Sequence, residues 1–261
     1  MFRMIRTEIW KLKRYHIIWA GVFLMLLSVL LTIFSTTALD GTYWTFEHFA
    51  EQVIKNNVTM IFPMCITLIA GYIIAREEKD DTLKSILTVP ISWRGLLWGK
   101  LVVCALLSLF LGLASAVFTV IGNLVMGFPG LSAASVLQTF LQIILNCLFL
   151  YLAVMPVIAA AAHIPNGHMI GTIIAFVYGY GGMFAGGNTT LSNIYPVMAS
   201  LGMINYRSYD PAVHWNIFVC LLSLLFALLV AAVFILTVKE SESASGKAVK
   251  KPKKAVTKKG W

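Results

Sequence analysis

The sequence of 261 residues is 59% hydrophobic and only 12% charged, with a mean hydropathy of +0.84, which excludes a soluble globular domain and indicates a membrane protein. A helix needs about 20 apolar residues to cross a hydrocarbon core of about 30 Å, so the chain has room for about six spans but for no second soluble domain. The net charge of +9 is concentrated in residues 1–15, 76–100 and 239–261, beside apolar stretches, and the basic residues do not alternate with aromatic stacking positions. This pattern favours anionic lipid headgroups over nucleic acid as a partner.

Residues 1–15 are predicted to form an amphipathic helix at the membrane surface. Ile5 and Ile9 fall on one face of this helix, and Arg6 falls on the other. The first span, 17–38, follows directly. It is too long and begins too late for a cleaved signal peptide.

Hydropathy predicts an all-α integral membrane domain over residues 16–238. The six expected spans are 17–38, 57–75, 101–125, 136–162, 169–187 and 215–238. Five Lys or Arg precede the first span, five lie in residues 76–100 and eight follow the last span. The expected outer segments 40–56 and 188–214 carry one each. The positive-inside rule therefore places both termini in the cytoplasm of a multi-pass protein, and we expect the bacterial cytoplasmic membrane.

Three segments outside the spans have distinct compositions. Residues 40–56 are poor in basic and rich in aromatic residues, so they are expected on the outer face. The apolar run 194–204 is too short to cross, which predicts a re-entrant or surface-lying outer hairpin before the last span. Residues 239–261 lack hydrophobic periodicity and are predicted to be a disordered basic cytoplasmic tail.

Two spans carry informative side chains. In the fifth span, Gly171, Ala175 and Gly179 recur at every fourth position, which predicts close packing against another helix. In the fourth span, Gln138, Gln142 and Asn146 recur at the same spacing and form a polar stripe on an apolar helix. Such a stripe either lines a substrate route or makes ordinary hydrogen bonds between helices.

No motif for catalysis or metal binding is found in the sequence. The four cysteines lie in apolar stretches without CxxC spacing, and His163 and His168 do not share a helical face. Residues 95–100 fail the spacing of a phosphate-binding loop, so the chain is not expected to be an enzyme that hydrolyses ATP. An intramembrane enzyme would need ionisable residues inside the spans, and all such residues are expected at or beyond span ends.

Residues 76–100 form the longest charged internal segment. Asp80 or Asp81 can cap a short helix that places Leu83, Ile86 and Leu87 on one side. Pro90 then ends this helix. The predicted product is a short rigid helix parallel to the membrane, on which a partner protein could push. The alternative is a solvated loop that only obeys the positive-inside rule.

This segment resembles the ABC-2 type of exporter permease, which carries Glu-x-x-x-Gly-Thr-Leu, then Leu-Leu-x-x-Pro-[Ile/Val]-Ser-Arg, and then a Lys at the head of the third span. The matching residues here are Glu77, Thr82, Leu83, Ile86, Leu87, Pro90, Ile91, Ser92 and Lys100. The chain departs from the pattern at Asp81, where Gly is usual, and at Trp93, where Arg is usual. The basic helix with Glu8-x-x-Lys11-x-Lys13-Arg14 and the number of spans also match.

The resemblance implies a permease that works as a pair, either with a second copy or with a paralogous permease. Each permease would receive one separate ABC ATPase, which would bind the ATP and Mg²⁺, so no cofactor is expected in this chain. The coupling residues that the resemblance implies are Glu77, Asp81, Thr82, Leu83, Ile86, Leu87 and Pro90.

The short length and the Asp-Asp-Thr-Leu variant look most like permeases of bacitracin-resistance and lantibiotic-immunity exporters. Such a resemblance implies export of an amphipathic peptide, an antibiotic or a lipid-like substrate out of the membrane. The alternative function is a non-transporting membrane scaffold or assembly factor.

Overall fold

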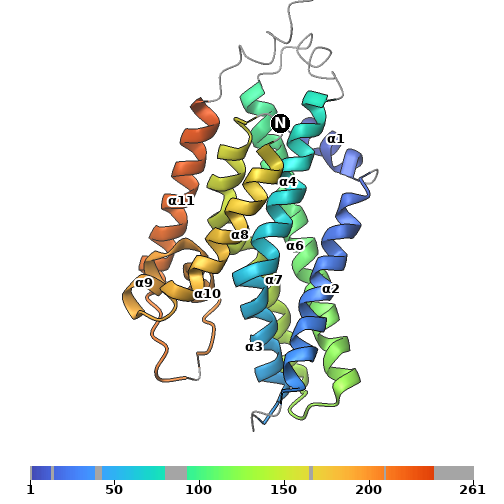
Figure 1. The fold of residues 1–261 in the computed structure, drawn as a ribbon, viewed down its shortest axis with the longest axis vertical. Coiled ribbons are helices and arrows are strands. Elements are labelled where there is room, and N and C mark those ends of the chain that lie inside the picture. The colour runs from blue at the N-terminus through green and yellow to red at the C-terminus, as the bar shows by residue number, and fades with distance from the viewer. Residues whose placement is uncertain are drawn as a thin grey trace, which may run out of the picture.

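The computed structural model describes residues 2–12, 15–38, 43–79, 93–164, 167–208 and 210–237, and this part of the chain is helical with no strand. The elements are α1 (Phe2–Leu12), α2 (Ile17–Thr36), α3 (Phe46–Asn56), the π-helix η1 (Asn57–Ile61), α4 (Phe62–Lys79), α6 (Trp93–Met126), α7 (Ala133–Ala161), α8 (Gly167–Ala185), α9 (Thr189–Ile194), α10 (Pro196–Met203) and α11 (Ile217–Thr237). Figure 1 shows the long helices side by side along the long axis of the molecule.

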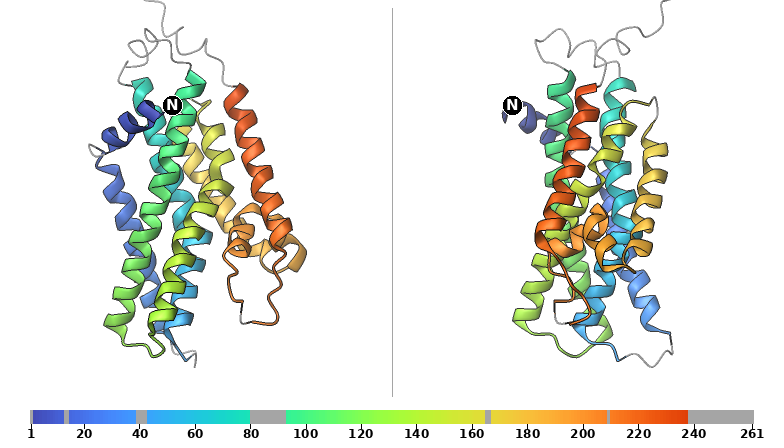
Figure 2. Two further views of the ribbon diagram at one scale, coloured as in Figure 1. Left: turned by 180° about the vertical axis from the view of Figure 1, so that it is seen from behind. Right: turned by 90° about the vertical axis from the view of Figure 1, so that its left-hand side faces the viewer.

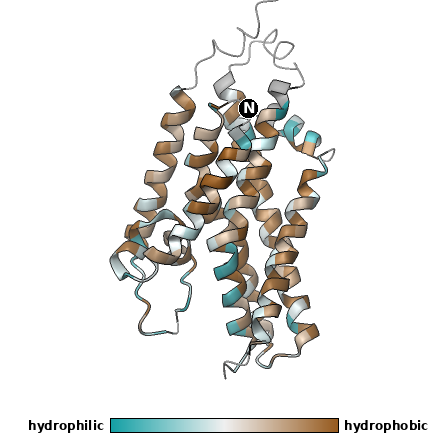
Figure 3. Cartoon of the chain, viewed as in Figure 1, coloured by the Kyte–Doolittle hydropathy of each residue, from teal (hydrophilic) through white to brown (hydrophobic). Residues whose placement is uncertain are grey.

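In the described part of the chain, six helices are long and apolar enough to cross a membrane: Ile17–Thr36, Phe46–Arg76, Gly95–Met126, Ala133–Ala161, Gly167–Ala185 and Ile217–Thr237. The prediction of an all-helical protein with six membrane-crossing helices is therefore confirmed. Hydrophobic residues cover most of the surface of these helices, whereas hydrophilic residues gather on α1 and α3 (Figure 3).

The ends of the helices fall into two groups. The helix α1, the end of α4, the start of α6 and the end of α11 lie together at one end of the bundle, which we call the α1 end (Figures 1 and 2). The end of α2, the start of α3 and the connection from α6 to α7 lie at the opposite end. An even number of crossings accounts for the position of α1 and of the end of α11 on the same side.

The second membrane-crossing helix is longer than the sequence predicted. It begins at Phe46 rather than at residue 57, because Thr45 caps its first turn and no helix breaker follows before Pro63. Glu47, Glu51 and Lys55 therefore belong to this helix, although the sequence pattern placed them in an outer segment. The π-turn η1 ends two residues before Pro63, which has no N–H group to continue the regular hydrogen-bond pattern.

The continuous helix formed by α3, η1 and α4 is the most deeply buried of the six. On one side α4 packs against α8, and on the others it packs against α2, α6 and α7. The glycine face of α8 makes this approach possible, because a Cβ atom on Gly179 would lie 2.9 Å from both the Thr59 carbonyl oxygen and Pro63 Cγ. The predicted close packing of the fifth span is confirmed.

Polar contacts hold the neighbours of this helix in register. The Asn56 Nδ2 atom donates to Thr32 Oγ1 of α2 at 2.9 Å, and Asn57 Nδ2 donates to Ser115 Oγ of α6 at 2.9 Å. The Tyr151 hydroxyl of α7 donates to the Leu101 carbonyl oxygen of α6 at 2.7 Å. Asn56 is half-buried, and the other groups in these contacts are buried, so the hydrogen bonds satisfy polar groups among apolar side chains.

The segment predicted as an outer hairpin forms α9 and α10, which turn back between α8 and α11 (Figure 1). Tyr195 adopts an extended conformation before Pro196, which separates the two helices. Asn193 fastens the turn, because its amide group bonds the His214 carbonyl oxygen and the Asn216 N–H group. The residues of α10 are buried against α7 and α11, and the depth of this hairpin in the membrane stays a prediction.

Gly179→Ala is expected to lower the free energy of unfolding by about 1–3 kcal/mol, because the added methyl group forces α8 away from η1. The measurement is the apparent melting temperature of the purified protein in detergent. Gly187→Ala is the matched control, since a Cβ atom there would lie 3.6 Å from its nearest neighbour, the Phe184 carbonyl oxygen. Equal melting temperatures for the two variants would contradict the prediction.

Candidate functional site

The coupling residues predicted from sequence fall at and beyond the end of α4. Glu77 belongs to α4, which ends at Lys79. The remaining predicted residues, Asp81, Thr82, Leu83, Ile86, Leu87 and Pro90, lie outside the described residues. The structure does place the two helices from which this segment extends, and both meet α1 at the α1 end of the bundle (Figure 2).

A buried ion pair joins α1, α4 and α6 close to that segment. The Lys100 side chain of α6 is fully buried, and the Glu8 side chain of α1 is 3% exposed. Lys100 Nζ lies 3.4 Å from Glu8 Oε2 and donates to the Ile73 carbonyl oxygen of α4 at 2.9 Å. Glu8 also accepts from Lys11 of its own helix at 2.6 Å. We call Glu8, Ile73 and Lys100 the junction.

A second contact fastens the start of α2 to the end of α4. The Arg76 guanidinium carbon lies 4.7 Å from the centre of the Tyr15 ring, and Arg76 Nη1 donates to the Tyr72 hydroxyl at 3.2 Å. The two tyrosine rings meet edge to face, with their centres 6.2 Å apart. Cation–π contacts of this kind are worth about 0.5–2 kcal/mol. The last turns of α4 are thus held on two sides.

The sequence contained the members of the junction but not their pairing. Glu8 and Lys100 were both part of the matched pattern, yet they are 92 residues apart and neither had a predicted role. Glu8 also lies among basic residues of a helix expected at the membrane surface, where a carboxylate is ordinarily exposed. Only the packing of α1 on α6 explains why this carboxylate is buried.

The polar stripe of α7 divides into two environments. Asn146 is buried and accepts from the Ser200 hydroxyl of α10 at 3.2 Å, so it makes a hydrogen bond between helices. Gln142 is half-buried and donates to the Ile204 carbonyl oxygen at 3.4 Å. Gln138 is exposed at the opposite end of the bundle. The hydrogen-bonding interpretation therefore holds for Asn146, whereas Gln138 and Gln142 face a pocket.

That pocket has a volume of about 250 Å³ and a polar lining. It lies between α3, α7 and the turn after α10, and its lining includes Gln138, Gln142, Glu47, Glu51 and Arg207. Arg207 Nε lies 3.3 Å from Glu51 Oε2, so the carboxylates of α3 meet a cation there. We call this space the polar pocket.

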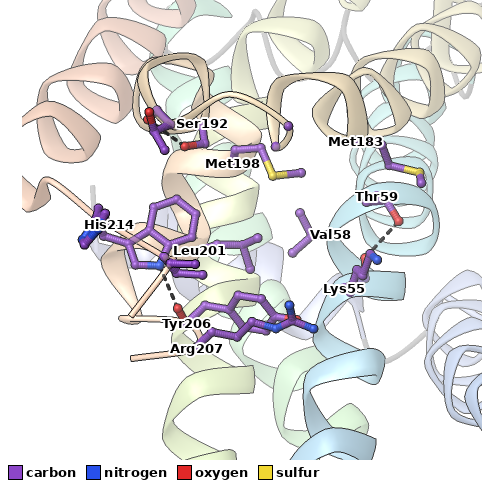
Figure 4. A pocket seen from close by; sticks show the side chains of 16 residues that line it. Lys55, Val58, Thr59, Met183, Ser192, Met198, Leu201, Tyr206, Arg207 and His214 are labelled. Carbon is purple, nitrogen blue, oxygen red and sulfur yellow. Dashed lines mark hydrogen bonds between the residues drawn. The ribbon is translucent and has the colours of Figure 1, made fainter. Parts of the chain in front are cut away.

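A larger cavity of about 390 Å³ lies on the other side of the same turn. It is bounded by α3, η1, the end of α8, α9, α10 and the segment before α11 (Figure 4). Its walls are apolar on the α8 and α10 sides, where Met183, Met198 and Leu201 lie, whereas Lys55 extends into it from α3. We call this space the main cavity.

The turn after α10, which separates the polar pocket from the main cavity, is held by hydrogen bonds. Asn205 and Arg207 have positive φ angles of 51° and 54°, a conformation that costs a non-glycine residue about 1–2 kcal/mol. The Trp215 indole N–H donates to the Tyr206 carbonyl oxygen at 2.7 Å, and the Tyr206 hydroxyl donates to the Glu51 carbonyl oxygen at 3.2 Å. Burial raises the pKa of Tyr206 to about 12, so this phenol stays a neutral donor at physiological pH.

Sequence reasoning missed Glu47, Glu51, Lys55 and Arg207 as functional candidates. The spacing of four between Glu47, Glu51 and Lys55 was a usable signal, because it places all three on one face of a helix. Among the described residues, no group of three His, Cys, Asp or Glu side chains has an arrangement suited to a metal ion. Both spaces are lined by charged and apolar side chains that could bind a ligand.

Comparison with known proteins identifies relatives of the chain. Residues 4–182, more than half of the chain, match the family model described as ABC-2 family transporter protein. Among curated proteins, the chain is similar to the bacitracin transport permease protein BCRB of Bacillus licheniformis, with 31% identity over 113 residues. The match covers 42% of this chain and 54% of that protein, so the chain spans about half the length of this curated relative.

Glu8→Ala is expected to lower the free energy of unfolding by about 3–5 kcal/mol, because it removes the Glu8 carboxylate that is paired with the buried Lys100 ammonium group. The double variant Glu8→Leu with Lys100→Met removes both charges, so it should be more stable than Glu8→Ala. Chemical unfolding of the purified variants in detergent measures both effects. A double variant that is no more stable than the single variant would contradict the burial of this pair.

Asn146→Leu is expected to lower the free energy of unfolding by about 1 kcal/mol, because it removes a buried hydrogen-bond partner of Ser200. Gln138→Leu should change it by less than about 0.5 kcal/mol, since its side chain is exposed. Thermal unfolding of both variants in the same detergent compares two positions of one helical stripe. A larger loss of stability in Gln138→Leu than in Asn146→Leu would contradict the assignment of the buried hydrogen bond to Asn146.

Proposed function

The chain belongs to the ABC-2 family of transporter proteins, and we propose that it is the permease subunit of an ABC exporter. The proposed exporter moves an amphiphilic substrate out of the membrane. A family model over most of the chain and six apolar helices establish a multi-pass ABC transporter permease. The direction of transport, the substrate and the coupling residues are part of the proposal.

The observation that carries the proposal is the junction. A motor protein that pushes on the segment between α4 and α6 moves the membrane helices only if that segment is attached to rigid elements. Glu8, Lys100 and the Ile73 carbonyl group tie α1, α4 and α6 together within hydrogen-bonding distance. Force applied next to the junction therefore reaches three helices rather than one loop.

The proposed partners follow from the family. Permeases of ABC transporters act with an ABC ATPase and usually with a second permease, and we propose that the ATPase docks on Glu77, Asp81, Thr82, Leu83, Ile86, Leu87 and Pro90. ATP and Mg²⁺ would be bound by that separate subunit. The α1 end would face the cytoplasm of a bacterial cell, with both termini on that side.

The proposed substrate is an amphipathic peptide, an antibiotic or a lipid-like molecule that leaves the membrane. The similarity to a bacitracin transport permease supports a role in resistance or immunity to antimicrobial peptides. The main cavity also supports it, because one wall is apolar and the other carries charged side chains. Such a lining suits a molecule that is apolar at one end and polar at the other.

Glu77→Ala and Leu83→Asp are expected to abolish co-purification with an ABC ATPase co-expressed from a neighbouring reading frame, since both changes remove proposed docking contacts. Leu131→Asp is the matched control, because Leu131 is exposed and belongs to the connection from α6 to α7, which lies away from the α1 end. The measurement is the amount of ATPase retained by the tagged permease and its ATP hydrolysis in nanodiscs. Retention of the ATPase by both variants would reject these residues as the coupling site.

A permease that copurifies with the ATPase but leaves its rate of hydrolysis unchanged would favour the alternative function. That alternative is a membrane scaffold or assembly factor that transports nothing. A rate that responds to an added amphiphile would support transport instead.

A further inference from the structure

The main cavity has an unbalanced charge. Its lining includes the cations Lys55 and Arg207 together with the imidazole of His214, and no carboxylate is among its lining residues in the described part of the chain. Lys55 Nζ makes no hydrogen bond or ion pair with the residues that the structure describes. Its ammonium group therefore presents a full positive charge to whatever occupies the cavity.

Arg207 is held between the main cavity and the polar pocket. Its guanidinium group contacts Glu51 at 3.3 Å on the side of the polar pocket. The side chain is 41% exposed, and Figure 4 shows it directed toward the Lys55 side of the main cavity. Arg207 is thus one of two cationic side chains in the lining of the main cavity.

Several polar groups of the cavity already donate hydrogen bonds to backbone carbonyl groups. Thr59 Oγ1 donates to the Lys55 carbonyl oxygen at 2.9 Å, and Ser192 Oγ donates to the Thr189 carbonyl oxygen at 2.9 Å. The Trp215 indole N–H and the Tyr206 hydroxyl also donate to backbone carbonyl groups. The polar recognition that the cavity offers a ligand therefore comes mainly from two cationic groups.

The rest of the lining is apolar. Val58, Met183, Met198, Leu201 and the Trp215 ring form walls against which a hydrocarbon chain can pack. Methionine side chains adapt to different shapes, which suits ligands with flexible chains. Met183 belongs to α8, whose exposed residues are mostly apolar, so the cavity adjoins an exposed apolar surface.

We propose that the main cavity binds an amphiphile with an oxyanion head group, a phosphate or a carboxylate, which lies between Lys55 and Arg207 while its apolar chain packs along α8 and α10. This inference rests on the proposed function and specifies its substrate class, an anionic amphiphile in preference to a cationic peptide. A cationic head group at this place would face the like charge of Lys55. Glu51 attracts a cation only in the polar pocket, where Arg207 already neutralises it.

The test is a binding titration of the full chain in nanodiscs of zwitterionic lipid, with empty nanodiscs subtracted. The probes are dodecyl phosphate, dodecanoate, dodecyltrimethylammonium and inorganic phosphate. We expect both anionic amphiphiles to bind at least about tenfold more tightly than the cation, with affinities that fall as salt is raised. Inorganic phosphate should bind at least about tenfold more weakly than dodecyl phosphate, because it lacks the apolar chain.

Substitutions at Lys55 and at Glu51 should change the affinity for dodecyl phosphate in opposite directions. Lys55→Gln should weaken binding of dodecyl phosphate by about tenfold, whereas Lys55→Arg keeps the charge and should stay within about threefold of the parent protein. Glu51→Gln removes the carboxylate that competes for Arg207, so it should tighten binding several-fold. Melting temperatures of the variants control for folding.

Tighter binding of dodecyltrimethylammonium than of dodecyl phosphate, or equal binding by Lys55→Gln and the parent protein, would overturn the inference. Equal affinities for inorganic phosphate and dodecyl phosphate would show that the apolar chain contributes nothing to binding, which would overturn the proposal of an amphiphile site. The titration contains no ATPase, so its result is independent of coupling. A chain that binds the anionic amphiphile but recruits no ATPase would disprove the proposed function and leave this site intact.

Discussion

The buried ammonium group of Lys100 determines how the helices meet at the α1 end. Moving an isolated ammonium ion from water into a protein interior costs several kcal/mol, so such a charge is stable only beside compensating groups. Glu8 supplies the opposite charge from α1, and the Ile73 carbonyl group supplies an acceptor from α4. The residue belongs to α6, so its burial requires all three helices at once. The segment that joins α4 to α6 is consequently anchored at both of its ends by the same interaction.

Most of the fold followed from the sequence, because the length of an apolar run is a local property that a bilayer selects strongly. The second helix was the exception. Glu47, Glu51 and Lys55 make residues 46–56 look polar in any window average, yet their spacing places them on one face. The other faces carry Phe46, Phe49 and Val53, which are fully buried. A hydropathy average cannot distinguish an exposed polar loop from a helix whose polar face lines a pocket.

The candidate site was predictable only where neighbours in sequence are also neighbours in space. The stripe of Gln138, Gln142 and Asn146 was correctly placed on one face of a helix, but its division depends on α10, which covers Asn146 and leaves Gln138 exposed. The pairing of Glu8 with Lys100 and of Glu51 with Arg207 joins distant parts of the chain. Such pairs arise from packing geometry, which a single sequence does not encode locally.

The long second helix connects the two places that matter for the proposed transport cycle. Lys55 at the main cavity and Ile73 at the junction belong to one continuous helix and are about 27 Å apart along its axis, at about 1.5 Å per residue. Between them lies η1, where the regular ladder gives way to a π-turn before Pro63, and π-turns of this kind are weak points at which helices bend. Movement of the junction can therefore reach the cavity as a displacement of the whole helix or be absorbed at η1. The close packing of Gly179 on Thr59 and Pro63 supports η1 from the side of α8, which favours transmission over bending.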